Sequence, residues 1–198
     1  LPVVICVDRA GVVGSDGVTH QGLYDYAMLK SLPNLVIAQP KDEEDLKVLL
    51  KEALGRNGPT VIRYPRGAVP CKVDLPPPSQ ISRCAIWATG DSLEKAKKVA
   101  SAVGGCEVVY ARFLKPYDRE KLLSQKRAGM KIVSIENAAL AGGFGETIGA
   151  DLRFGWPDKF IPHGSCAELE KKYAFDVESI VSATREFLDV VATEKNEG

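Results

Sequence analysis

Short apolar runs rich in β-branched residues recur along the chain, and each is bounded by glycine, proline or charged residues. Runs of this length and composition are typical of buried strands rather than helices, because helices need longer periodic segments. The predicted strands are VVICV (3–7), LVIAQP (35–40), TVIRYP (60–65), CAIWAT (84–89), EVVYA (107–111), KIVSIE (131–136) and KFIP (159–162).

Amphipathic patterns lie between most of these strands. In residues 42–56 apolar side chains recur every three to four positions and form one stripe, which predicts a helix packed on a sheet. Similar stripes predict helices over residues 92–103 and 176–191. Strands that alternate with amphipathic helices indicate an α/β protein with a mostly parallel sheet whose faces are covered by helices.

The composition changes after the third predicted strand, where prolines are frequent and neither a helical nor a strand period is visible. Consecutive prolines stiffen a segment into an extended spacer. We therefore predict a first domain over residues 1–67, a linker over 68–80 and a second domain over 81–198. The first part has too few predicted strands to form a complete sheet. We expect it to be half of a domain, in an internal fragment that opens on a strand at Leu1.

The charge balance excludes two broad classes of partner. Lys and Arg total 26 and Asp and Glu total 26, so no net field attracts nucleic acid or anionic lipid. No run approaches the roughly 18 apolar residues of a membrane span, and no signal segment leads the sequence. We therefore expect binding to neither nucleic acid nor membranes, and any bound anion must be held by local geometry.

The five cysteines include no CxxC pair. Cys6, Cys84 and Cys106 lie in or beside apolar strands, where a free thiol behaves as a small hydrophobic side chain. This pattern predicts free thiols in a reducing compartment, and hence a cytoplasmic protein.

The glycine-rich loop DRAGVVGSDGVTHQG (8–22) follows the first strand and carries the strongest chemical signal. Ligands of open α/β sheets bind beyond the carboxyl ends of the strands, so we expect this loop to border a binding crevice. Arg9 is suited to a phosphate or carboxylate, Asp16 to a hydroxyl group, and His20 to proton exchange near neutral pH. The alternative is structural: Arg9 pairs with Asp8 or Asp16, and His20 caps the next helix.

The third strand ends in VIRYPRG, which places Arg63 and Arg66 around a proline. Side chains alternate along a strand and proline turns the chain, so the two arginines should point in different directions. One of them could reach the same crevice as Arg9, and two arginines from neighbouring strand ends would form a phosphate clamp. Without further information, ordinary ion pairs explain both arginines equally well.

The segment SIENAALAGGFGETIG (134–149) has the appearance of a nucleotide-binding loop. Its glycines do not have the GxGxxG spacing of a dinucleotide-binding loop, and no strand that ends in an acidic residue follows about 20 positions later. We therefore interpret the glycines as allowing close packing at a domain or subunit contact. Glu136 would end its strand near a polar partner. The second histidine, His163, lies on a turn and is interpreted as structural.

Taken in order, these motifs resemble one enzyme family. DRAGVVGSDGVTHQG, LYDYAMLKSLPN, VIAQPKDEEDL and VIRYPRG resemble the second half of the pyrimidine-binding domain of 1-deoxy-D-xylulose-5-phosphate synthase. ENAALAGGFGE and DKFIPHGS resemble the transketolase-type C-terminal domain of the same family. The resemblance extends over essentially the whole chain. It implies half of a Rossmann-like pyrimidine-binding domain followed by an α/β domain with a mostly parallel sheet.

The resemblance also implies a reaction. Enzymes of this family use thiamine diphosphate and Mg²⁺ to condense pyruvate with glyceraldehyde 3-phosphate, with loss of CO₂, and the product supplies isoprenoid, thiamine and pyridoxal synthesis. By the matching motifs, Arg9 and Arg66 would bind the acceptor phosphate, Asp16 would contact a hydroxyl group, and His20 would lie beside the reacting carbon.

The main cofactor and metal ligands of the family would lie upstream of Leu1. We therefore expect the fragment alone to be inactive and the whole enzyme to be a cytoplasmic homodimer. Two alternatives remain open. One is the β subunit of a 2-oxo-acid dehydrogenase or a related transketolase-like protein, and the other is a non-catalytic module that binds a phosphorylated metabolite.

Overall fold

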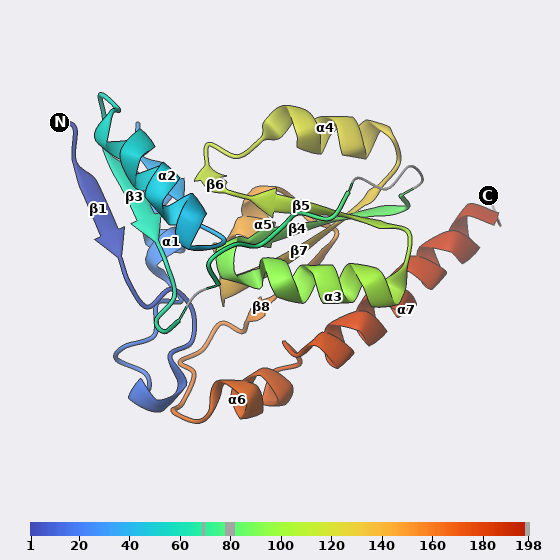
Figure 1. Ribbon diagram of the computed structural model, residues 1–198. Coiled ribbons are helices and arrows are strands. Elements are labelled where there is room, and N and C mark those ends of the chain that lie inside the picture. Colours follow the sequence, from blue (N-terminus) through green and yellow to red (C-terminus); the bar gives the residue numbers. More distant parts are fainter. Residues whose placement is uncertain (69, 78–81, 197–198) are drawn as a thin grey trace.

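A computed structural model gives the fold and describes residues 1–68, 70–77 and 82–196. The strands form two four-stranded sheets with helices packed against them (Figure 1). Nearly all neighbouring strands run parallel, and among the described strands only β2 and β6 pair antiparallel. The prediction of an α/β protein with mostly parallel sheets is therefore confirmed.

The first sheet has the strand order β1-β3-β2-β6, with bounds Val4–Val7 for β1, Thr60–Arg63 for β3, Val36–Ala38 for β2 and Phe113–Lys115 for β6. Helix α2 (Glu43–Leu54) covers one face through Leu49 and Ala53, which pack against Ala38 and Ile62. The helix starts where the Asp42 side chain accepts the backbone N–H of Asp45, as an N-cap does.

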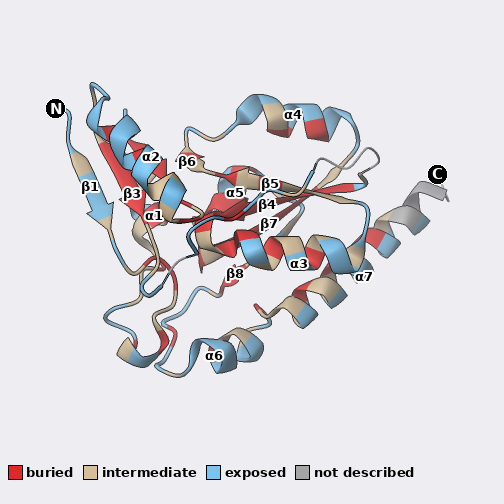
Figure 2. Ribbon diagram, viewed as in Figure 1, coloured by how far each residue is buried: buried red, intermediate tan, exposed pale blue. Residues whose placement is uncertain are grey.

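The second sheet is entirely parallel, with the order β5-β4-β7-β8 and bounds Cys106–Ala111, Cys84–Thr89, Lys131–Ala139 and Leu152–Trp156 respectively. The helices on it are α3 (Leu93–Val103), α4 (Arg119–Arg127), α5 (Phe144–Thr147) and α7 (Val177–Asn196). Ile86 and Ala88 of β4 pack in the cluster that includes α3 and α7, whereas Ala85 and Trp87 pack in the cluster that includes α4 and α5. Since successive strand residues face opposite sides, both faces are covered, and β4 is buried throughout (Figure 2).

One hydrophobic cluster joins the two sheets. It contains Ile37 and Val61 of the first sheet together with Trp87 and Ile132 of the second. Tyr26, on the short helix α1 (Asp25–Leu29), is part of the same cluster and is almost fully buried. The two sheets therefore share one hydrophobic cluster, in addition to the clusters that α2 forms on the first sheet and that α3 and α7 form on the second.

Strand β6 reinforces this connection. It follows β5 of the second sheet after a single residue, Arg112, yet it pairs with β2 of the first sheet. A strand from beyond the proline-rich segment thus completes the first sheet. That segment, predicted as a linker over 68–80, lies partly outside the described residues, and its described part packs on the start of α2, where Glu43 and Glu44 donate N–H bonds to the carbonyls of Pro70 and Cys71.

The last predicted strand is wrong. Residues 159–162 form no strand, and Phe160 is 72% exposed. The strand in that region is β8, in which Leu152, Phe154 and Trp156 alternate with Arg153 and Gly155 and pack inward. The alternation is typical of a strand, but the charged residue and the glycine obscured it.

The three amphipathic helices predicted from the sequence are present as α2, α3 and α7. Two further helices were not predicted, α4 and α6 (Cys166–Lys172). The sequence SCAE (165–168) does carry a signal for α6, because Ser165 and Glu168 form a capping box. None of the described helices is long and apolar enough to cross a membrane.

The cysteines differ from expectation. Cys84 and Cys106 form a disulfide instead of remaining free thiols, because they are register partners on β4 and β5 with their Cα atoms 4.8 Å apart. Cys6, expected to be a buried apolar residue, is exposed on β1, the edge strand of the first sheet. Cys71 and Cys166 are free and exposed.

Candidate functional site

The loop over residues 8–22 is closed at its base by backbone hydrogen bonds. The N–H of Gly22 donates to the carbonyl of Arg9 (2.9 Å), and the N–H of Gly11 donates to the carbonyl of Gly22 (2.8 Å). A Cβ atom at Gly22 would overlap the Arg9 carbonyl, so only glycine permits this approach. Ala10 donates to the carbonyl of Tyr64 (2.9 Å) and thereby attaches the loop to the end of β3.

Arg66 and Asp16 are brought into contact. The guanidinium Nη1 of Arg66, just beyond β3, pairs with Oδ2 of Asp16 in the short 3₁₀ helix η1 (Gly14–Asp16). The Arg66 side chain is 55% exposed, and in the described part of the chain only its Nη1 is engaged. The remaining N–H groups are therefore open to an incoming anion.

Arg9 and His20 are not joined to that pair by any hydrogen bond or ion pair among the described residues. The Nε atom of Arg9 lies 4.0 Å from Oδ2 of Asp8, and the Arg9 side chain is 40% exposed. The backbone of Arg9 is in the left-handed region, at φ 61°. His20 is exposed, and its Nδ1 lies 2.9 Å from Oγ1 of Thr19. The structure thus shows the Arg9–Asp8 pair that the sequence left as an alternative, but His20 does not cap α1, whose N-cap is Tyr24.

A cavity of about 590 Å³ lies beside Arg66 at the carboxyl ends of the first sheet's strands. Asp8, Tyr64 and Arg66 line it on one side, and Asp91 and Leu93, at the start of α3, line it on the other. Arg9, Asp16 and His20 are not among its lining residues. Its position agrees with the general location of ligand sites in open α/β sheets.

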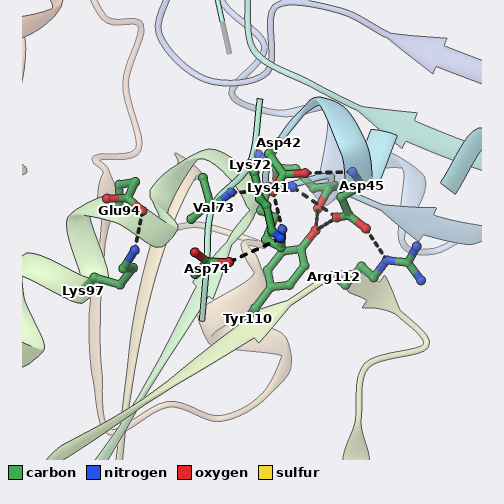
Figure 3. Close-up of polar contacts among 11 residues, drawn as sticks. Lys41, Asp42, Asp45, Lys72, Val73, Asp74, Glu94, Lys97, Tyr110 and Arg112 are labelled. Carbon is green, nitrogen blue, oxygen red and sulfur yellow. Dashed lines mark hydrogen bonds and ion pairs between the residues drawn. The ribbon is translucent and has the colours of Figure 1, made fainter. Parts of the chain in front are cut away.

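A polar network supports the wall of this cavity (Figure 3). The carboxylate of Asp42 accepts the N–H groups of Asp45 and Val73 at 2.7 Å each and pairs with Lys41. Burial raises the pKa of Asp42, but these three donors outweigh it, so the pKa lies below its usual value. The network therefore fixes the proline-rich segment, through Val73, against the start of α2.

The same network reaches the second sheet through Asp45. Its carboxylate accepts Nε of Arg112 at 2.7 Å and pairs with the hydroxyl of Tyr110, which lies on β5. Burial and the neighbouring carboxylate both raise the pKa of Tyr110, which therefore remains a neutral donor. The cavity wall is thus built jointly by residues of both sheets.

Arg63 and Arg66 point in different directions, as the alternation of side chains along a strand predicts. Arg66 is exposed, whereas Arg63 points into the protein. It is 1% exposed and donates to the carboxylate of Asp25 through Nε and Nη2 (2.8 and 3.2 Å). It also donates to Gln39 Oε1 (2.7 Å) and to the carbonyl oxygens of Gly22 (3.1 Å) and Asn137 (3.3 Å). Arg63 therefore fixes the base of the loop to the second sheet and is not free to bind a ligand.

Asp91 continues this buried network, and its importance was not predicted from the sequence. Its two carboxylate oxygens accept the amide groups of Gln39 (2.6 Å) and Asn137 (2.7 Å). Burial raises its pKa, although Asn137 and Arg63 oppose the shift. Asn137 in turn accepts Nε1–H of Trp156 at 2.7 Å, so the network extends to the far strand of the second sheet.

The glycines over 142–149 serve packing. Glu136 accepts the backbone N–H groups of Phe144 (2.6 Å) and Gly145 (2.8 Å), and a Cβ atom on Gly143 would lie 2.8 Å from that carboxylate. A Cβ atom on Gly142 would lie 2.9 Å from the Cβ of Ala27 in α1. The glycines thus allow close contact within the second sheet and with the first part of the chain.

His163 lies beside the candidate loop, which the sequence did not indicate. A Cβ atom on Gly17 would meet the Cβ of His163 at 3.3 Å, and the N–H of Gly164 donates to the carbonyl of Gly14 (3.3 Å). Both histidines of the chain are therefore at or next to this loop.

Comparison with known families and proteins agrees with the fold. The family "Transketolase, pyrimidine binding domain" matches residues 1–72, and "Transketolase, C-terminal domain" matches residues 79–180. The chain therefore belongs to the transketolase family.

Within this family the resemblance to 1-deoxy-D-xylulose-5-phosphate synthase is confirmed. The chain is 40% identical to 1-deoxy-D-xylulose-5-phosphate synthase 2 of Geobacter sulfurreducens, over 93% of this chain and 34% of that protein. It is also 40% identical to the synthase of Thermomicrobium roseum, over 95% of this chain and 34% of that protein. The chain thus spans about a third of the length of these relatives.

Solved structures share the fold. A transketolase mutant from Pichia stipitis superposes with a TM-score of 0.80 at 20% identity, covering 98% of this chain and 31% of that one. A split-gene transketolase, described as an inactive tetramer, gives a TM-score of 0.76 at 22% identity and covers 94% of this chain and 67% of that one.

Proposed function

We propose that the chain forms the acceptor-phosphate side of a 1-deoxy-D-xylulose-5-phosphate synthase. The reaction is the condensation of pyruvate with glyceraldehyde 3-phosphate and the release of CO₂. The observation that carries the proposal is the contact between Arg66 and Asp16, which joins the VIRYPRG strand end to the DRAGVVGSDGVTHQG loop at the ligand-binding edge of the sheet. The 40% identity to synthases over nearly the whole chain supports it.

In this proposal the phosphate dianion of the acceptor binds the open N–H groups of Arg66, and Asp16 turns to a substrate hydroxyl group. Among the described residues Arg9 is paired only with the exposed carboxylate of Asp8, its Nε lying 4.0 Å from Oδ2, so little energy opposes its movement toward the phosphate. Anchoring the remote phosphate positions the aldehyde, and His20 then stabilises or protonates the developing alkoxide.

Thiamine diphosphate, when bound, would supply the carbanion chemistry that decarboxylates pyruvate. The described residues contain no group of three or more His, Cys, Asp or Glu side chains suited to a metal ion. Because the chain spans about a third of the length of its relatives, we assign the Mg²⁺, diphosphate and main thiamine ligands to other parts of a longer protein and only the acceptor-phosphate side to this chain. Activity is accordingly assigned to that whole protein and not to the chain alone. By the family resemblance we also propose a cytoplasmic homodimer, although the Cys84–Cys106 disulfide removes the free-thiol argument for a reducing compartment.

The test is Arg66→Ala in the whole synthase that contains this chain. Because Arg66 binds only the phosphorylated substrate, we expect KM for glyceraldehyde 3-phosphate to rise at least roughly tenfold, the weight of one charge-assisted hydrogen bond. The KM for pyruvate should change less than twofold. Steady-state kinetics with each substrate varied in turn gives both values.

Arg56→Ala is the matched control, because Arg56 is also exposed and lies just beyond a helix of the same sheet. It should leave both KM values unchanged. Equal increases for the two substrates in Arg66→Ala would show that Arg66 does not bind the phosphate.

A further inference from the structure

A second cavity shares no lining residue with the cavity of the candidate site. It measures about 530 Å³, within the usual range for small-ligand pockets. Its lining residues come from α1, β6, the start of α4 and the end of α5. Its lining residues are Tyr26, Lys30, Ser31, Leu114, Lys115, Pro116, Tyr117, Arg119 and Thr147.

The lining includes three cationic side chains and no carboxylate. Lys30 donates to Oγ1 of Thr147 (3.1 Å), and Lys115 donates to the backbone carbonyl of Lys30 (2.7 Å). Within the described residues Arg119 makes neither a hydrogen bond nor an ion pair with a side chain, and none of the three cations is paired with an acidic group. Like charges held together without a counterion repel one another, so this arrangement favours a bound anion.

Aromatic and apolar side chains form most of the remaining lining, beside Ser31 and Thr147. The rings of Tyr26 and Tyr117 each pack edge-on against Phe144 at centroid distances of 6.4 Å. Leu114 and Pro116 complete an apolar wall beside the cations. Aromatic rings already fixed by their neighbours lose little conformational entropy when a ligand packs on them.

We propose that this cavity binds a small organic phosphate with a flat apolar group. Arg119 and Lys30 hold the phosphate, and Tyr117 and Pro116 contact the apolar part. The site is separate from the acceptor site, since the two cavities share no lining residue, and the proposal stands independently of the function proposed above.

The probe is phenyl phosphate, titrated by calorimetry into the purified 198-residue chain and, in parallel, into the longer synthase to which we assign it. We expect saturable binding that is roughly tenfold or more weaker in Arg119→Ala and in Lys30→Met, because each removes a charge-assisted contact. Both side chains are at the surface, so folding should survive either change. Inorganic phosphate and phenol should each bind more weakly than phenyl phosphate.

Two control variants separate this site from other anion binding. Arg127→Ala removes a charge at the opposite end of α4, and Arg56→Ala removes an exposed charge just beyond α2; both should leave the affinity unchanged. The proposal is overturned if neither protein gives saturable binding, if Arg119→Ala and Arg127→Ala have equal effects, or if Arg66→Ala alone abolishes binding. Equal affinity for inorganic phosphate would refute the apolar contact.

Discussion

At the scale of single residues, the least expected group is the carboxyl of Glu136. It is almost completely buried within the central strand β7, where two backbone N–H groups are its hydrogen-bond donors. Burial raises its pKa to about 7, and the two donors and Arg63 only partly oppose that shift. A group that titrates near neutral pH inside the core makes stability depend on pH.

The direction of that dependence follows from proton binding. Between the ordinary pKa of 4.5 and the folded value of about 7, the folded state keeps the Glu136 proton and the unfolded state releases it. The contribution of Glu136 to the free energy of unfolding is therefore largest below pH 4.5 and falls as pH rises to 7, by up to about 3 kcal/mol. Urea unfolding at several pH values should show this slope flattened in Glu136→Gln.

Glu120→Gln provides the comparison, since Glu120 is an exposed acid in the first turn of α4. Its stability profile should run parallel to that of the unmodified chain over the same pH range. If the free energy of unfolding of Glu136→Gln also changes with pH in parallel with that of the unmodified chain, the carboxyl of Glu136 does not titrate between pH 4.5 and 7.

The two arginines of VIRYPRG show how far residue-level prediction extends. Alternation along the strand correctly predicts that Arg63 and Arg66 point in different directions. It does not tell which one faces solvent, because that depends on Asp25, Gln39 and Asn137, which are distant in sequence. The sequence predicts that Arg66 and Asp16 lie at the same edge of the sheet, but it does not predict that they form an ion pair.

At the scale of elements, strongly periodic segments were predictable and short ones were not. The stripes of α2, α3 and α7 are long enough for their period to be visible in the sequence. Strand β6 has only three residues and is defined by pairing with β2, more than seventy positions earlier in the chain, so no local pattern could indicate it. Local signals cannot report a pairing that tertiary structure decides.

Helix α6 is the exception, because its capping box was readable and has a measurable effect. The N–H of Glu168 donates to Oγ of Ser165, and the carboxylate of Glu168 accepts the N–H of Ser165, each at 3.3 Å. Ser165→Ala removes one of these bonds and should lower the free energy of unfolding by about 1 kcal/mol. Urea denaturation followed by circular dichroism measures the change.

Ser101→Ala is a suitable control for that measurement, because Ser101 is an exposed residue inside α3, where alanine is the better helix former. Its stability should be equal to that of the unmodified chain or slightly higher. If Ser101→Ala lowered the free energy of unfolding as much as Ser165→Ala, the capping box of α6 would make no specific contribution to stability.

At the scale of the whole molecule, Arg63 is one of the residues that link the two sheets. Arg63 lies at the end of β3 in the first sheet and donates to the carbonyl of Asn137, on β7 of the second. Because the sheets also share a hydrophobic cluster, we expect the chain to unfold as one cooperative unit, although the sequence suggests two parts divided by prolines. Unfolding should therefore follow a single transition, whether monitored by circular dichroism or by tryptophan fluorescence.

Removing Arg63 should affect the whole molecule, because it leaves the Asp25 carboxylate, whose side chain is only 12% exposed, without its partner. We expect Arg63→Leu to lower the free energy of unfolding by about 3–5 kcal/mol, the usual cost of breaking a buried ion pair from one side. Arg66→Ala, three positions further on, breaks an exposed pair and should cost less than about 1 kcal/mol. If Arg63→Leu does not fold, Asp25→Asn keeps the packing while weakening the same pair, and should still cost more than Arg66→Ala. Equal costs at the buried and exposed pairs would show that Arg63 does not hold the two sheets together.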